Sequence, residues 1–160
     1  MNLYRLKEDA QNPEDGEFLG KKLAYYDYAG FHRESLKGDI KVQPGERIAV
    51  VVTETITDKD GVKLYEYASN QSFTKEFAAM LGSQMYGVAV VNKGESFVYE
   101  NGQWTDWADY DKKPNAEFAA GVAGLGIELT SDMVSTDNFS IKLYVVAEKE
   151  TKETASVTTE

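Results

Sequence analysis

The chain contains no cysteine, only one histidine and no long apolar run. Without cysteine, disulfide bonds, thiolate zinc sites and a cysteine nucleophile are excluded within the chain. No stretch approaches the roughly 20 apolar residues of a membrane-spanning helix, so the sequence predicts no membrane insertion. A signal peptide is also missing, and because a strand-like pattern begins almost at Met1, we expect an export signal upstream.

Basic residues are scarce relative to acidic ones. Lys and Arg number 17 against 27 Asp and Glu, which gives a formal net charge of −10, and the acidic excess is spread along the chain. A phosphate backbone rewards clustered Lys and Arg, so nucleic acid is excluded as an expected partner. An anionic membrane surface would repel the same charge distribution.

Apolar content, by contrast, is sufficient for a folded core. Hydrophobic residues make up 42% and aromatic residues 12% of the 160 positions. A chain of this length forms one domain comfortably and two only with difficulty. We therefore predict one domain over residues 1–147, followed by a flexible C-terminal linker over residues 148–160, where Glu, Lys, Thr and Ser dominate.

Period-two alternation and β-branched runs dominate the domain, which indicates strands. The predicted strands cover residues 2–7, 17–26, 32–40, 47–57, 62–67, 86–91, 95–100, 103–107 and 139–147. Pro44-Gly45 predicts a type II turn, and Asn101-Gly102 predicts a tight hairpin. Two short helices are expected in loops, at 74–81 and 115–122. The predicted fold is all-β, an antiparallel, jelly-roll-like β-sandwich.

Four sequence blocks follow the order of a known family pattern. They are YAGFH at 28–32, PGERIAVVV at 44–52, GESF at 94–97 with GQWTD at 102–106, and DNFSIK at 137–142. Over residues 2–146 the chain resembles the lectin-like β-sandwich domain of bacterial cell-surface proteins, which often follows a papain-like cysteine protease domain. The resemblance implies an extracellular or cell-surface location, and any protease activity would belong to the neighbouring domain. The stretch 108–135 is longer than in common members.

Aromatic residues cluster near the predicted hairpin, at Tyr99, Trp104, Trp107 and Tyr110. Flat aromatic faces can stack on sugar rings while nearby carboxylates and amides bind hydroxyls, so these four residues are the candidate ligand-binding residues. Alternation places Trp104 and Trp107 on opposite faces of their strand. We expect Trp104 in the core and Trp107 and Tyr110 exposed.

Catalysis finds little support in the sequence. The single His32 lies within a strand pattern, and no nucleophile is placed beside it by sequence. No pair of acids stands out as a glycosidase pair among the 27. We therefore predict no enzyme and no catalytic residues. No cofactor is expected, although acidic loops at 8–15 and 137–138 could hold Ca²⁺; the alternative, that they are ordinary turns, stays open.

The sequence thus predicts a non-catalytic accessory module that recognises a carbohydrate or another cell-wall or surface component. The alternative is a structural spacer without a ligand of its own, which packs against an adjacent cysteine protease domain and positions it. Fold resemblance alone does not decide between them.

Overall fold

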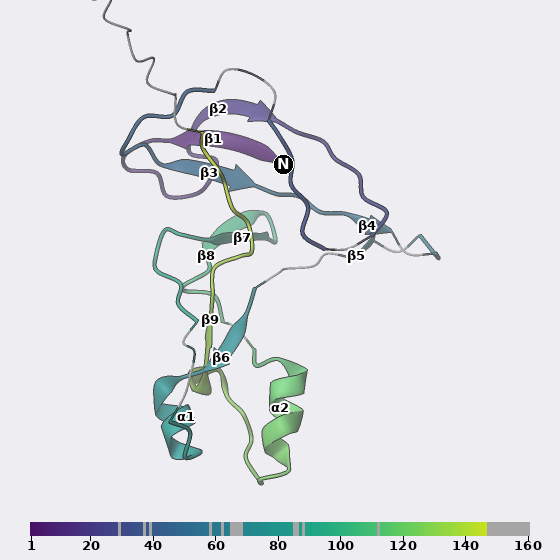
Figure 1. Cartoon of the computed structure of the whole chain (residues 1–160), viewed down its shortest axis with the longest axis vertical. Helices are drawn as coiled ribbons and strands as arrows, with labels where there is room; N and C mark the ends of the chain where they lie inside the picture. The colour runs from purple at the N-terminus through teal and green to yellow at the C-terminus, as the bar shows by residue number, and fades with distance from the viewer. Residues whose placement is uncertain are drawn as a thin grey trace, which may run out of the picture.

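The computed structural model describes residues 1–28, 30–36, 38, 40–57, 59–61, 63–64, 69–84, 87, 89–111 and 113–146. Within these residues the chain is β-rich, with short strands and few helices (Figure 1). The strands are β1 (Asn2–Leu6), β2 (Gly16–Lys21), β3 (Ile48–Val51), β4 (Ile56–Thr57), β5 (Lys63–Leu64), β6 (Gln71–Phe73), β7 (Phe97–Glu100), β8 (Gln103–Asp106) and β9 (Val134–Thr136). The helices are α1 (Lys75–Met80), α2 (Ala116–Ala123) and the 3-10 turn η1 (Ser131–Met133).

The N-terminal sheet has the order β2-β1-β3, with antiparallel pairing on both sides of β1. Leu3 on the central strand is only 3% exposed, as expected for an apolar residue that faces the covered side of a sheet. A register shift between Leu3 and Tyr4 leaves one extra residue on β2, which is a β-bulge. Arg5, also on β1, forms ion pairs with Glu17 on β2 (2.6 Å) and with Glu46 just before β3 (3.1 Å).

A tight hairpin joins β7 to β8. Asn101 and Gly102 both have positive φ, at 52° and 85°, which is the backbone conformation of a two-residue type I′ turn. Because this turn fixes the register, Tyr99 pairs directly with Trp104 and Val98 with Thr105. The predicted hairpin is therefore confirmed.

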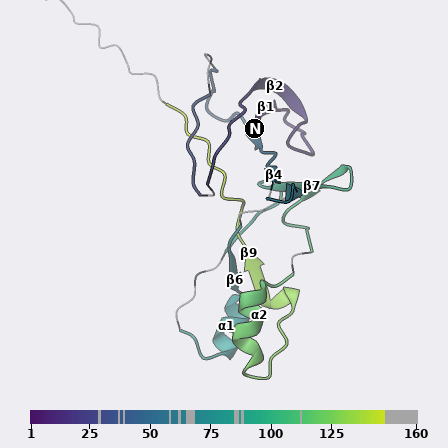
Figure 2. The ribbon, with the colours of Figure 1, turned by 90° about the vertical axis from the view of Figure 1, so that its right-hand side faces the viewer.

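A third unit brings both helices against the β6–β9 ladder, at the end of the molecule far from the β1–β3 sheet (Figures 1 and 2). Thr74 caps α1, since its hydroxyl accepts a hydrogen bond from the Phe77 backbone N–H at 3.3 Å. The Phe73 ring lies 5.1 Å from that of Phe77 and 5.0 Å from that of Phe118, so one strand residue contacts both helical segments.

Buried side chains are distributed over these three units. The apolar ones are Leu3, Val51, Phe77, Ala78, Val98, Trp107, Val122 and Val134, and Thr136 is the buried polar residue among them. Trp107 links two of the units, because its indole N–H donates to the Asp137 carbonyl at 3.2 Å, just beyond β9. In the described part of the chain, no helix has the length and apolar composition needed to cross a membrane.

Most elements with strong local signals lie where the sequence predicts them. Strands β1, β7 and β8 and both helices fall within their predicted ranges or overlap them closely. At the predicted type II turn, Gly45 has φ +88° and the Glu46 N–H donates to the Gln43 carbonyl at 3.1 Å. β2 ends at Lys21, short of the predicted 26, and the predicted strand 47–57 is split into β3 and β4.

Three predicted strands are wrong where the structure describes them, namely 32–40, 86–91 and 139–147. Their alternating sequences do not pair with a neighbouring strand, since extended propensity alone does not supply a partner. Conversely, β6 and β9 were not predicted, because each is only three residues long. Of the predicted strand 62–67, β5 covers 63–64, and the remaining residues lie outside the described part of the chain. The predicted linker, 148–160, also lies outside it, as does residue 147.

Gly16 offers a test of the N-terminal sheet. A Cβ at this position would overlap the Arg5 carbonyl oxygen, whereas one at Gly20 on the same strand would meet only Ile40 Cδ1, at 3.7 Å. Gly16→Ala should therefore lower the free energy of unfolding by about 1–3 kcal/mol, the usual cost of overpacking. Urea unfolding measures this, with Gly20→Ala as the matched control. Equal stability of the two variants would contradict the β1–β2 geometry.

Candidate functional site

The β7–β8 hairpin has one buried face and one exposed face. Val98 and Trp107, on the first face, are 2% and 7% exposed, whereas Tyr99, on the second, is 55% exposed. Trp104 is half-buried on the same face as Tyr99. The alternation predicted from the sequence is correct, but the assignment of the faces is wrong. Trp107 belongs to the core, and Trp104 lies at the surface.

Trp107 is held by its surroundings. Its ring stacks on that of Tyr110 at 4.9 Å and lies 4.8 Å from that of Phe139, while its N–H is bonded to the Asp137 carbonyl. Tyr110 is half-buried, and its hydroxyl donates to Glu100 at 2.8 Å, which raises the pKa of Tyr110. The expectation that Trp107 is exposed is therefore incorrect, and this pair serves packing.

Tyr99 and Trp104 form an aromatic pair on the outer face. They are directly opposite each other in the hairpin ladder, and their ring centroids are 5.1 Å apart with an interplanar angle of 59°. Such a tilted arrangement is favourable for aromatic rings and leaves ring surface available to solvent. Two of the four predicted ligand-binding residues are thus brought together at the surface.

Glu14 extends this pair to the N-terminal sheet. Its carboxylate accepts one hydrogen bond from the Trp104 indole N–H at 3.2 Å and another from the Tyr4 hydroxyl at 3.3 Å. Tyr4 in turn contacts Phe18, which is 52% exposed, edge to face at 5.5 Å. We call Tyr4, Glu14, Phe18, Tyr99 and Trp104 the aromatic–carboxylate surface.

The sequence pattern does not identify Glu14, Tyr4 and Phe18 as part of this surface. Glu14 lies 90 positions from Trp104, in the acidic loop that was considered for calcium. Tyr4 and Phe18 are cross-strand partners of β1 and β2, and their spacing is typical of any sheet. No local motif signals that the two sheets meet here.

The carboxylates of the hairpin itself have structural partners. Asp106 accepts hydrogen bonds from the backbone N–H groups of Gly94 (2.7 Å) and Ala108 (2.9 Å). Asp109 forms an ion pair with Lys93 at 3.0 Å. These acids fix the loops on either side of β7 and β8, whereas Glu14 is the carboxylate bonded to the Trp104 indole.

A second polar cluster ties the hairpin to the segment after β9. The Glu95 carboxylate accepts hydrogen bonds from the side chains of Asn138 (2.9 Å) and Asn92 (2.8 Å), and Ser96 donates to Asn138 at 2.7 Å. The bonds from Asn138 and Asn92 stabilise the ionised form and lower the pKa of Glu95 to about 2. This cluster is a clamp between two loops, and its amide donors are used internally.

His32 stacks on Tyr26, with ring centroids 3.7 Å apart, and its Nε2 lies 2.9 Å from the Tyr28 carbonyl oxygen. Tyr26 donates to Glu34 at 2.8 Å; partial burial, together with this bond, raises the pKa of Tyr26. The imidazole is thus bonded to a carbonyl oxygen and not to a hydroxyl nucleophile. Among the described residues, no three His, Cys, Asp or Glu side chains gather in a way that could hold a metal ion.

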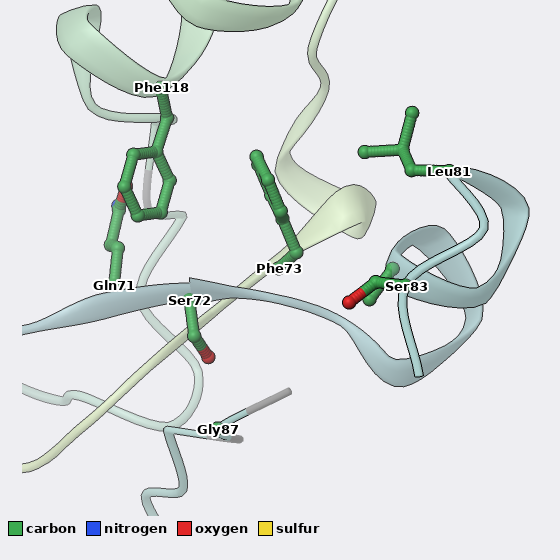
Figure 3. Close-up of a pocket in the computed structure, with 8 residues that line it drawn as sticks. Gln71, Ser72, Phe73, Leu81, Ser83, Gly87 and Phe118 are labelled. Carbon is green, nitrogen blue, oxygen red and sulfur yellow. The ribbon is translucent and has the colours of Figure 1, made fainter. Parts of the chain in front are cut away.

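A separate hollow of about 430 Å³ lies beside β6, between the two helices (Figure 3). Phe73, Phe118 and Leu81 supply apolar walls. Ser72 accepts from the Ala89 N–H at 2.8 Å and is bonded to Ser135, while Gln71 bonds the Lys113 carbonyl. Because these polar groups are hydrogen-bonded within the protein, the hollow offers mainly apolar contact. It therefore indicates the class of a ligand less well than the aromatic–carboxylate surface does.

Comparisons with known proteins identify no relative of the chain. No family model matches the chain, and no curated protein and no solved structure matches it with statistical significance.

The Glu95 clamp predicts a pH dependence of stability. The folded pKa of Glu95 is lowered from 4.5 to about 2, so the stability that its bonds contribute is complete above pH 4.5 and is lost as the pH falls toward 2. Asn138→Ala should raise this pKa toward its ordinary value. Carbon-13 NMR titration of the Glu95 carboxyl measures both values, with Gln103→Ala on the same hairpin as the control. Titration of Glu95 near its ordinary pKa in the unaltered protein would argue against the clamp.

Proposed function

We propose that the chain is a non-catalytic, lectin-like accessory module of a secreted or cell-surface protein, and that it recognises carbohydrate through the aromatic–carboxylate surface. The observation that supports this proposal best is the outer-face pair of exposed Tyr99 and half-buried Trp104, joined to Glu14 by the indole N–H. We also propose that the short strands belong to a two-layer sandwich, as in the family that the sequence resembles.

Sugar recognition needs flat apolar area and polar groups at its edge, because a pyranose has apolar C–H faces and a rim of hydroxyls. The rings of Tyr99 and Trp104 supply the apolar area. The Glu14 carboxylate supplies acceptors beside them, and the Tyr4 hydroxyl, which donates its proton to Glu14 at 3.3 Å, can accept a further hydrogen bond. Since the hairpin register fixes both rings, the surface is preorganised, which reduces the entropy lost on binding.

The acidic character of the chain fits this proposal and limits the ligand. A net charge of −10 disfavours nucleic acid and anionic surfaces but leaves glycan stacking unaffected. Calcium stays a prediction for the acidic loops, and the aromatic pair does not require it. Trp107 and Tyr110 support the surface from behind, by fixing β8 to the residues after β9.

Replacement of either ring of the aromatic pair should weaken glycan recognition. Trp104→Ala and Tyr99→Ala are each expected to weaken binding on a glycan array by about tenfold or more, equivalent to roughly 1.4 kcal/mol, with little change in the melting temperature. Tyr28→Ala, at a side chain that is 84% exposed elsewhere, is the matched control. Trp107→Ala should instead lower stability by about 3–5 kcal/mol. Undiminished binding by folded Trp104→Ala protein would refute the proposal.

A spacer role is the second candidate, and a specific observation favours it. Large apolar side chains are strongly exposed in two extended segments, residues 22–31 and 141–146; examples are Leu23 at 93%, Phe31 at 94% and Val146 at 91%. Arg33 links these segments, because its guanidinium lies 5.0 Å from the centre of the Tyr144 ring. Several large apolar side chains exposed along two segments favour a protein–protein contact, here with an adjacent protease domain.

The spacer role predicts thermal coupling between domains. In a longer protein that contains this chain beside a protease domain, Phe31→Ser should separate the unfolding of the two domains in calorimetry, because it removes apolar contact area. Ser96→Ala, within the Glu95 clamp, should leave the coupling intact. Independent unfolding in the unaltered protein would exclude the spacer role while leaving glycan recognition unaffected.

A further inference from the structure

Glu14 differs from the acidic residues around it. Asp15 is paired with Lys7 at 2.7 Å, and Glu17 is paired with Arg5 at 2.6 Å. In the part of the chain that the structure describes, no Lys or Arg forms an ion pair with Glu14. Its two bonded side chains, Tyr4 and Trp104, are both neutral, so its negative charge is not compensated locally.

The position of Glu14 is fixed although the residue is exposed. Its backbone N–H donates to the Asn12 side chain at 3.0 Å, and its carbonyl accepts from the Gly16 N–H at 2.9 Å. The phenol and the indole each occupy one carboxylate oxygen. Every carboxylate oxygen can accept two hydrogen bonds, so capacity for a further donor is left on both oxygens.

A cation at this point gains two interactions at once. An ammonium group can donate a charge-assisted hydrogen bond to Glu14, and such bonds are about twice as strong as neutral ones. The same ammonium can donate a second hydrogen bond to the Tyr4 hydroxyl oxygen, which lies beside Glu14 and keeps acceptor capacity. An anionic sugar meets the Glu14 charge and the overall charge of −10 and is repelled.

We propose that the aromatic–carboxylate surface selects saccharides that carry a protonated amine, such as 2-amino-2-deoxy sugars without an acetyl group. This selectivity rests on the proposed function, because the sugar ring itself is held by Tyr99 and Trp104. The amine lies at Glu14, and acetylation removes its positive charge and hence the preference.

Calorimetric titration of the full chain with two glucosamine hexasaccharides, one with free amines and one fully N-acetylated, tests this selectivity. The titration is run at about pH 6, where the free amines of the first saccharide are protonated. The free-amine form should bind about two- to fivefold more tightly, as expected for an ion pair with an exposed carboxylate. Glu14→Gln should remove that preference, so that the free-amine and acetylated forms bind with similar affinity.

Glu17→Gln is the matched control, because it removes one negative charge from a neighbouring residue that is already paired with Arg5. If Glu17→Gln lowers the preference for the free-amine saccharide as much as Glu14→Gln does, the effect belongs to overall charge and the selectivity is overturned. The same holds if a lysine hexapeptide binds as tightly as the free-amine saccharide. Equal affinity for both saccharides, with loss of both on Trp104→Ala, would overturn the selectivity alone. No binding of either saccharide and no hit on a glycan array would overturn the proposed function as well.

Discussion

Burial of Trp107 is the constraint on which the proposed site depends. The indole follows β8 directly, and it is fixed by its bond to the Asp137 carbonyl and by the rings of Tyr110 and Phe139. Because successive strand residues point to opposite faces, burial of Trp107 and Val98 turns Trp104 and Tyr99 outward. The core contact therefore determines which aromatic pair meets the solvent.

The rings of Tyr99 and Trp104 alone would form a small apolar patch, and Glu14 adds a negative charge and hydrogen-bond acceptors to it. The carboxylate connects the hairpin to the N-terminal sheet through Trp104 and Tyr4, so one residue serves both the packing of two units and the polarity of the surface. Hydrogen bonds from neutral donors leave its charge uncompensated. A surface of this kind combines stacking, which accepts many sugars, with a charge that discriminates among them.

Local signals in the sequence were sufficient where a few neighbouring residues determine the backbone. Asn101-Gly102 and Pro44-Gly45 specify their turns because these residues accept or impose the required φ angles. Thr74 and Asn115 specify helix starts by capping. The predicted strands 32–40, 86–91 and 139–147 failed for the opposite reason: a ladder requires a partner, and alternation within one segment does not identify that partner.

The sequence by itself determined the β-rich character, the hairpin with its register, the absence of cysteine chemistry and the division of Trp104 and Trp107 between two faces of one strand. Only the tertiary structure decided which of these faces is buried, because period-two alternation is symmetric with respect to inside and outside. It also brought Glu14 to Trp104 across 90 positions. Such contacts arise from the docking of separate units, and no local pattern encodes them.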